Sequence, residues 1–300
     1  METNILLESG TNELEILEFV VGGNHYGINV AKIKEILPYK KPTAIPNAHP
    51  CIEGIYMPRD LIITIVDLGK SLNLPPSDTE STDMYIVTNF NKLNIAFHVN
   101  NVLGIQRVSW ADISKPDESI SNSGKGVATG IIKMNEKLIV ILDFEKIVAD
   151  ISPETGLKVS DIDLLGERDR NTSPILIAED SPLLSKLIID SLHKAGYTNV
   201  IPNNNGQEAW DKLCEFRDDG SIFEKVKCVI TDIEMPQMDG HHLTKLIKED
   251  NILKKIPVII FSSLVNEEMK RKGESLGADA QLSKPEIGSL VGEIDRLIMK

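Results

Sequence analysis

The second half of the chain alternates short apolar runs with helical patterns, and this alternation constrains the fold more than any other feature. Apolar runs of strand length lie at 175–178, 226–231 and 258–261, and a further short strand is expected near Gln281. Between these runs, apolar residues recur at helical spacing. Parallel strands need such crossover helices, which cover both faces of the sheet. We therefore predict a doubly wound, five-stranded parallel sheet.

Polar residues stand where the predicted strands end. Glu179 and Asp180 follow the first strand, Asp232 the third, Ser262 the fourth and Lys284 the fifth. The carboxyl ends of parallel strands share one edge of the sheet, and ligands bind at that edge in open α/β sheets. Taken singly, each of these residues is more often a solvated loop start or a surface lysine. Because all of them occur together, we expect the side chains to converge on one site.

Three of these residues offer carboxylates to a divalent cation. Mg²⁺ takes oxygen ligands and keeps several waters, so two or three carboxylates from neighbouring loops are sufficient. Glu179, Asp180 and Asp232 supply them if the first and third strands are adjacent, and the backbone carbonyl of Glu234 would complete the protein ligands. The sequence therefore predicts a Mg²⁺ site at the carboxyl edge of the sheet.

Asp232 is also a candidate nucleophile. A carboxylate attacks phosphorus only if the charge of the incoming group is offset, and the cation offsets it on one side. Lys284 would offset it on the other side, and the Ser262 hydroxyl would donate to a phosphoryl oxygen. The product would be an aspartyl phosphate. Catalysis is then limited to self-phosphorylation and self-dephosphorylation, so we do not expect an enzyme.

Two other sites in this half are disfavoured. Asp232-Ile-Glu234 superficially resembles the nucleophile strand of haloacid-dehalogenase-type phosphatases, but those carry a second aspartate two residues on and a larger, cap-bearing fold. His241 and His242 suggest a metal pair, but neighbours on a helix point in different directions. We expect two ordinary surface or half-buried histidines.

The segment from Ile175 to the C-terminus resembles the receiver domain of two-component response regulators, which has the flavodoxin-like fold. It carries, in order, Ile-Ala-Glu-Asp-Ser, an Asp-x-x-x-Pro-x-x-x-Gly element, a hydroxyl residue after Pro-Val-Ile-Ile-Phe, and Lys-Pro. The resemblance implies that Asp232 is the phosphoacceptor and that a histidine kinase is the donor. One departure is Gln281, three positions before Lys284, where family members usually carry an aromatic switch residue.

The first half consists of short strand patterns separated by turns rich in Pro, Gly, Asn and Asp. Strand patterns lie at 15–21, 26–28, 61–66, 84–88, 94–99 and 137–142, while 30–37 fits either a strand or a short helix. This spacing is typical of a small barrel or sandwich. The sequence offers no Ser/His/Asp arrangement, Gly-rich phosphate loop or Cys/His cluster, so we expect this all-β half to bind protein rather than to catalyse.

Polar and charged residues flanked by prolines separate the halves and indicate a linker. We place the two domains at 14–150 and 174–300 and the linker at 151–173.

The first domain resembles the chemotaxis coupling protein CheW. The resemblance rests on 19–30, on Ile45-Pro-Asn, on the run Leu-Ile-Ile-Thr-Ile-Val-Asp-Leu at 61–68, and on 127–132 and 140–144 near the domain's end. It implies two small β-barrels that contact chemoreceptor signalling tips and the histidine kinase CheA.

Four residues fall on the binding surface by their position in this resemblance, namely Ile33, Glu35, Gly54 and Arg59. Each has a simpler explanation: Ile33 as core, Glu35 as a solvated charge, and Gly54 as a turn that needs positive φ. Arg59 is favoured as a contact because a guanidinium suits a specific interface. However, the family motif Asn-Leu-Arg-Gly is here Met-Pro-Arg-Asp, which places an acid beside Arg59.

A CheW-like domain followed by a receiver is the layout of the CheV family, which this chain resembles. The resemblance implies an adaptor that links chemoreceptors to CheA and is regulated by phosphorylation of Asp232, with adaptation to a sustained stimulus as the result. An alternative is a receiver that acts mainly as a phosphate sink for CheA. A transcriptional regulator would need a DNA-binding domain, which the sequence does not show.

Composition agrees with this class of protein. The net charge of −13 argues against nucleic acid as the main partner, because phosphate binding needs a clustered basic face. The three cysteines are far apart and form no metal-ligand spacing. The sequence has no signal-peptide pattern at its start and no apolar run of membrane-spanning length. We expect a cytoplasmic protein at membrane-associated receptor arrays, without direct membrane insertion.

Overall fold

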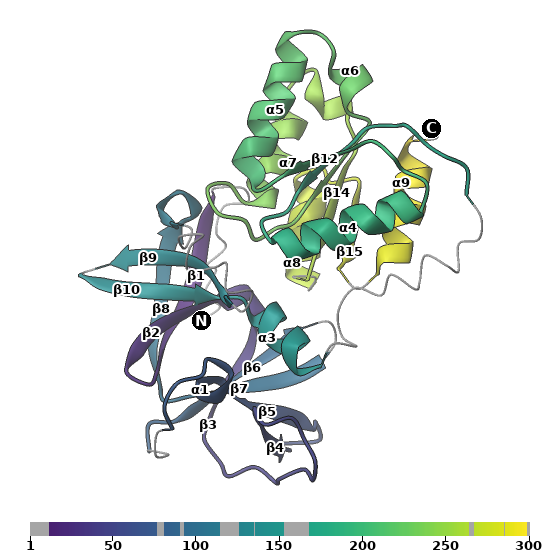
Figure 1. Ribbon diagram of the computed structural model, residues 1–300. Coiled ribbons are helices and arrows are strands. Elements are labelled where there is room, and N and C mark those ends of the chain that lie inside the picture. The colour runs from purple at the N-terminus through teal and green to yellow at the C-terminus, as the bar shows by residue number, and fades with distance from the viewer. Residues whose placement is uncertain are drawn as a thin grey trace. The chain divides into compact units, whose positions relative to one another are not determined.

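The computed structural model describes residues 12–76, 81–90, 93–114, 126–134, 136–152, 168–263, 267–284 and 286–298. The chain forms two compact units: one is Leu14–Thr155, and the other consists of Gly156–Lys300 together with Met1–Glu13. Figure 1 labels their helices and strands. Each unit has hydrophobic clusters of its own.

The second unit alternates strands and helices as its sequence pattern predicts. Its elements are β11 (Ile175–Ala178), α4 (Pro182–Lys194), β12 (Val200–Asn203), α5 (Gly206–Asp218), α6 (Ile222–Lys225), β13 (Cys228–Thr231), α7 (Gly240–Glu249), η5 (Leu253–Lys255), β14 (Val258–Ser262), α8 (Glu267–Ser275), β15 (Ala280–Ser283) and α9 (Ile287–Ile298). The strand order is β12-β11-β13-β14-β15, and all neighbouring pairs are parallel. The predicted five-stranded parallel sheet is confirmed, and β12 supplies the strand that no apolar run had indicated.

Helices cover both faces of this sheet (Figure 1), and alternate residues of β11 pack against opposite layers. Ile175 and Ile177 of β11 pack in a cluster with α4 and α9, whereas Leu176 packs in a second cluster with α5 and α7. Because both faces are covered, every residue of β11, β13 and β14 is buried, which explains the continuous apolar runs. This burial leaves the sheet's edge at the strands' carboxyl ends as the place for polar side chains.

The first unit is built from strands. Its elements are β1 (Glu13–Val21), β2 (Asn24–Asn29), η1 (Val30–Lys32), β3 (Ile33–Pro38), β4 (Ile52–Tyr56), β5 (Ile63–Asp67), α1 (Leu68–Ser71), β6 (Met84–Phe90), β7 (Leu93–Val99), β8 (Asn101–Ser109), η2 (Trp110–Asp112), β9 (Ala128–Met134), β10 (Lys137–Leu142) and α3 (Phe144–Ile151). The segment 30–37, ambiguous from its pattern, is a short 3-10 helix followed by a strand.

The strands form two five-stranded sheets, ordered β8-β1-β2-β10-β9 and β3-β6-β7-β5-β4. A bridge between Ser114 and Ile131 joins the chain after β8 to β9, and a bridge between Thr43 and Ile55 joins the chain after β3 to β4. Each bridge closes a sheet between its two edge strands, so the predicted pair of small barrels is confirmed. The core they share includes the edge-to-face rings of Phe97 and Phe144, with centroids 4.7 Å apart.

Strand β8 was not predicted from its pattern. Its outward-facing positions include Leu103 and Ile105, which are 45% and 59% exposed. Since apolar residues stand on the solvent side of this strand, the usual alternation of buried apolar and exposed polar residues is lost, and the periodic signal disappears.

Candidate functional site

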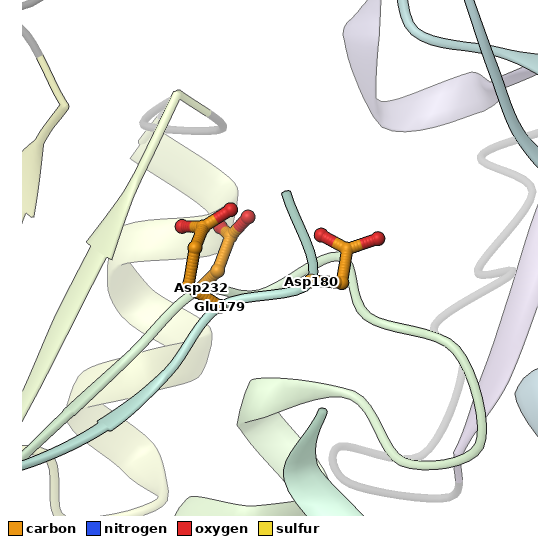
Figure 2. Close-up of side chains that lie close together, drawn as sticks. All are labelled: Glu179, Asp180 and Asp232. Atoms are coloured by element: carbon orange, nitrogen blue, oxygen red, sulfur yellow. The ribbon is translucent and has the colours of Figure 1, made fainter. Parts of the chain in front are cut away.

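The register of two neighbouring strands brings Glu179 and Asp232 together. Ala178 of β11 pairs with Thr231 of β13, so the residue that follows each strand stands at the same level of the sheet. The backbone N–H of Asp232 donates to the carbonyl of Ala178 over 3.0 Å and extends this pairing by one residue. Figure 2 shows the carboxylates of Glu179 and Asp232 side by side, with Asp180 next to them.

Within the described residues, these three acids form the one group of side chains that could together hold a metal ion. One carboxylate oxygen from each of Glu179, Asp180 and Asp232 lies within 4.8 Å of the other two. Glu179 and Asp232 are almost fully buried, whereas Asp180 is partly exposed. A cluster of oxygen donors with one side open to water fits a hard divalent cation.

The electrostatics of Glu179 also fit a cation. Burial raises the pKa of Glu179 well above its ordinary value, and the charges of Asp232 and Asp180 raise it further, while Lys284 opposes them. The Oε2 atom of Glu179 is buried and makes no hydrogen bond within the described residues, although it lies 3.1 Å from the Lys284 ammonium. A buried carboxylate that two other acids crowd is stabilised by added positive charge, so Glu179 suits a metal ion as a ligand.

Lys284 reaches the same place from the other side of β13. Its Nζ donates to Oδ2 of Asp232 over 2.7 Å, and its side chain is buried. The backbone N–H of Lys284 donates to the carbonyl of Ser262 over 3.1 Å, which ties the end of β15 to the end of β14. Ser262 is fully buried as the last residue of β14. The structure thus places all the strand-end residues singled out from the sequence along one edge of one sheet.

The backbone around Asp232 is held by contacts that sequence reasoning did not find. The N–H of Ile233 donates to Oδ1 of Asp232 over 2.6 Å. A Cβ atom on Gly240 would collide with the carbonyl oxygen of Asp232. Gly240 itself donates from its N–H to the carbonyl of Ile233 over 2.9 Å. The glycine of the Asp-x-x-x-Pro-x-x-x-Gly element is therefore required by a close backbone approach, for which the motif was the only signal.

Glu234 lies two residues after Asp232 in the connection to α7, and its backbone carbonyl as a cation ligand stays a prediction. His241 and His242 lie in the first turn of α7 and are not part of the acidic group. His242 is half-buried as expected, but His241 is buried, so the expectation of a surface or half-buried side chain was wrong for His241. Burial lowers the pKa of His241 to about 3, so this imidazole is neutral. Its Nε2 atom is buried and has no hydrogen-bond partner among the residues with described positions.

Gln281 lies on β15, where the family usually has an aromatic residue. Both polar atoms of its carboxamide are buried and have no hydrogen-bond partner in the described ranges. A Cβ atom on Gly273 of α8 would collide with the Gln281 Oε1 atom, so the absence of a side chain at Gly273 makes room for the amide. The position that departs from the family pattern thus holds an inward-facing polar group.

The predicted coupling surface, made of Ile33, Glu35, Gly54 and Arg59, lies in the second barrel of the first unit. Arg59 is 79% exposed and pairs with Glu35 on β3 over 3.5 Å. Ile33 is half-buried and packs on the core. Gly54 is buried in β4 with a φ of +150°, and a Cβ there would collide with the carbonyl of Thr43. Gly54 thus has a backbone reason to be glycine, and binding by these four residues stays a prediction.

None of the helices in the described ranges combines the length and the apolar character needed to cross a membrane.

Comparisons with known proteins agree with this two-domain architecture. The model of the CheW-like domain matches residues 15–152, and the model of the response regulator receiver domain matches residues 175–295. Chemotaxis protein CheV3 of Helicobacter pylori is 30% identical over 304 residues, which covers 96% of this chain and 96% of that protein. Chemotaxis protein CheV2 of the same organism is 29% identical over 87% of this chain and 86% of its own length.

A third relative covers only the first domain. Chemotaxis protein CheW of Bacillus subtilis is 24% identical over 48% of this chain and 92% of that protein. The CheV relatives span both domains in one chain, as this protein does. The chain therefore belongs to the CheV family of chemotaxis proteins, with a CheW-like domain and a response regulator receiver domain.

Proposed function

We propose that this protein is a chemotaxis adaptor that couples chemoreceptor signalling tips to the histidine kinase CheA, and that phosphorylation of Asp232 regulates the coupling during adaptation. The observation that carries the proposal is the convergence of Glu179, Asp180 and Lys284 around Asp232. The similarity to CheV and CheW proteins over the full chain and over the first domain supports the coupling role.

Glu179, Asp180 and Asp232 would hold Mg²⁺ in this site. When bound, Mg²⁺ neutralises charge between the acceptor carboxylate and the incoming phosphoryl oxygens. The proposed donor is a phosphohistidine of CheA: a P–O bond to Asp232 forms as the P–N bond breaks, and the leaving imidazole takes a proton.

Residues of the chain itself orient and stabilise the acceptor carboxylate of Asp232. Ile233 holds Oδ1 of Asp232 through its backbone N–H, so the carboxylate has a defined orientation before transfer. Lys284 already contacts Oδ2, so its ammonium lies within reach of a phosphoryl group on that carboxylate. Ser262, at the end of the adjacent strand, would donate its hydroxyl to a phosphoryl oxygen. The added negative charge then changes the contacts of Lys284 and Ser262, and with them the loops after β14 and β15.

Transfer of labelled phosphoryl groups from phospho-CheA tests the receiver function. With Mg²⁺ present, we expect label on the wild type and none on Asp232→Asn. Asp190→Asn is the matched control, because Asp190 is an exposed carboxylate on α4 and the substitution is the same. Chelation of Mg²⁺ should abolish phosphoryl transfer to both the wild type and Asp190→Asn. Absence of label on the wild type, or its persistence on Asp232→Asn, would remove Asp232 as the phosphoacceptor.

Co-sedimentation of the full chain with receptor signalling tips and CheA tests the coupling function. We expect Arg59→Ala to weaken assembly, because its guanidinium is exposed on the predicted coupling surface. Arg107→Ala is the control: Arg107 is also an exposed arginine paired with one carboxylate, Glu15, but lies on β8 outside that surface. Equal assembly by both variants would place coupling elsewhere.

Kinase activity in the assembled complex separates regulation from a phosphate sink. If phosphorylation regulates coupling, Asp232→Ala changes receptor control of CheA even when total phosphoryl drain is matched by an added acceptor. If the receiver only drains the kinase, coupling is the same with and without Asp232.

A further inference from the structure

His98 lies in the second barrel between two carboxylates. Its Nδ1 atom is 2.7 Å from Oε1 of Glu53, and its Nε2 atom is 3.0 Å from Oδ2 of Asp83. The His98 and Glu53 side chains are 12% and 16% exposed, and that of Asp83 is 1% exposed. An ionised carboxylate can accept hydrogen bonds but cannot donate them. An imidazole donates from both of its nitrogens only when it is protonated. Both contacts are therefore made at once only by the imidazolium.

The three residues join separate parts of the barrel. His98 lies on β7 and Asp83 immediately precedes β6, which pairs with β7. Glu53 lies on β4, which reaches β7 only across the intervening strand β5. The register of β4 against β5 shifts between Ile52 and Gly54, so Glu53 is the extra residue of a β-bulge. A bulge re-aims a side chain, and here the Glu53 carboxylate reaches over to His98.

Within the part of the chain that the structure describes, the contacts of the ring include no second basic group for these acids. The His98 ring stacks on Tyr39 with centroids 4.8 Å apart and meets the edge of Tyr85 at 5.6 Å. The Tyr85 hydroxyl donates to the carbonyl of Lys40, and the Asn100 amide lies 3.5 Å from Asp83 Oδ1.

Further out, the basic group within reach of the Glu53 charge among the described residues is Lys70 of α1. Lys70 pairs with Asp67 over 3.0 Å, and the charges of both Glu53 and Cys51 act on Lys70. Burial by itself lowers the pKa of His98, but the hydrogen bonds and charges of Glu53 and then Asp83 outweigh it, so this pKa is raised above 6.5.

We propose that His98 is a proton-dependent strut: while protonated, it holds the Glu53 bulge of β4 against β6 and β7, and loss of the proton releases Glu53. The bulge precedes Gly54 and the connection that carries Arg59, so the strut sets the position of this part of the coupling surface. The strut itself does not depend on the proposed function; only its effect on coupling does.

Glu53 is the partner released, because the two acids differ in burial. A neutral imidazole keeps one N–H and turns a lone pair toward the other carboxylate. The Asp83 side chain is almost inaccessible to water, so leaving its Oδ2 atom without a donor costs more than leaving Glu53, which can turn to solvent. The remaining proton therefore stays on Nε2, facing Asp83, and the contact across β5 is lost.

The direction of the pH effect follows from the raised pKa. Because the folded pKa lies above the unfolded value of 6.5, the stabilisation is fully present below pH 6.5 and is lost as pH rises through the folded pKa. Because the imidazole of His98 loses its proton over this range, the first unit should unfold at a lower temperature at pH 9 than at pH 6.

NMR titration of the histidine ring protons in the full chain tests the strut directly, with His98→Gln to assign the signal. We expect a pKa above 6.5 for His98 in the wild type and a downward shift of about one unit in Glu53→Gln, because one acid is removed. A pKa at or below 6.5, or no shift in Glu53→Gln, would overturn the proposal. Glu53→Gln keeps the test decisive if His98→Gln does not fold.

Thermal unfolding provides a second readout, which is the stability of the first unit. In a Trp210→Phe background, Trp110 is the only tryptophan and reports on the first unit, where it is buried. We expect the midpoint to fall between pH 6 and pH 9 in this background and to fall less in the Glu53→Gln variant. His193→Gln, an exposed histidine of the second unit, is the control and should behave like the background. The same pH dependence with and without Glu53→Gln would contradict the strut.

Discussion

The ammonium of Lys284 lies 2.7 Å from Oδ2 of Asp232, with side chains only 6% and 7% exposed. It also lies 3.1 Å from Glu179, so one buried cation serves two buried carboxylates. Removing one member of a buried ion pair destabilises a protein far more than replacing the whole pair by apolar residues, because it leaves an uncompensated buried charge.

Lys284→Met should therefore destabilise the second unit by about 3 kcal/mol. Urea unfolding without Mg²⁺ measures this, with Trp210 as the reporter in a Trp110→Phe background. Lys186→Met is the control, since Lys186 is exposed on α4. Adding Asp232→Asn to Lys284→Met should recover part of the loss, and strictly additive effects would show that the two residues do not interact.

Gly240→Ala should impair the phosphoryl site without removing any functional group. The new Cβ would collide with the carbonyl oxygen of Asp232 and displace the acceptor's backbone. A displacement on the order of 1 Å lowers the rate of transfer by about 100-fold. The rate of labelling by phospho-CheA checks this.

Gly292→Ala is the matched control for Gly240→Ala. Gly292 lies inside α9 with nothing near the position of a new Cβ, so the same substitution should stabilise the protein by about 0.5–1 kcal/mol. A normal labelling rate for Gly240→Ala would mean that the loop adjusts freely.

His241 should make the second unit sensitive to acid. Burial holds its folded pKa at about 3, below the ordinary value of 6.5, so the unfolded chain binds the proton more readily. The stabilisation is present above pH 6.5 and is lost as pH falls toward 3, by up to about 1.4 kcal/mol per pH unit. The urea midpoint followed by Trp210 between pH 7 and pH 4.5 should fall less steeply in His241→Leu than in wild type. Parallel curves would show that this imidazole charges without cost.

Gln281→Met should raise the stability of the second unit by about 1 kcal/mol. The carboxamide is buried without a described partner, and replacing an unpaired polar group by an apolar one of similar shape removes its desolvation cost. Thermal unfolding with Trp210 as the reporter measures the gain. A loss of stability would mean that the amide is satisfied in solution.

Gly273 tests the same contact from the other side. Gly273→Ala should destabilise the unit because its Cβ meets Oε1 of Gln281, and Gln281→Ala should relieve that collision in the double variant. An equal loss of stability in the single and double variants would assign the cost to the Cδ1 atom of Ile260, which is the next atom that the new Cβ meets.

Local patterns predicted the fold class of the second unit, although no apolar run indicated β12. The alternation of apolar runs and helical stripes specifies parallel strands, and the edge position of Asp232 follows from where its strand ends, because carboxyl ends of parallel strands share one side. The resemblance to receiver domains then indicated the role expected of Asp232. Each of these inferences uses residues close together in the chain or an ordered series of short motifs.

The tertiary structure alone decided which side chains meet. Strand β8 carried no readable alternation because Leu103 and Ile105 face outward. The partners of His98 lie 45 and 15 residues away in the chain, and a bulge at Glu53 aims one of them. The collision that excludes a side chain at Gly240 is with the backbone of Asp232. Such contacts depend on strand register and backbone approach, which are set by the packing of the whole domain and leave no periodic mark in the sequence.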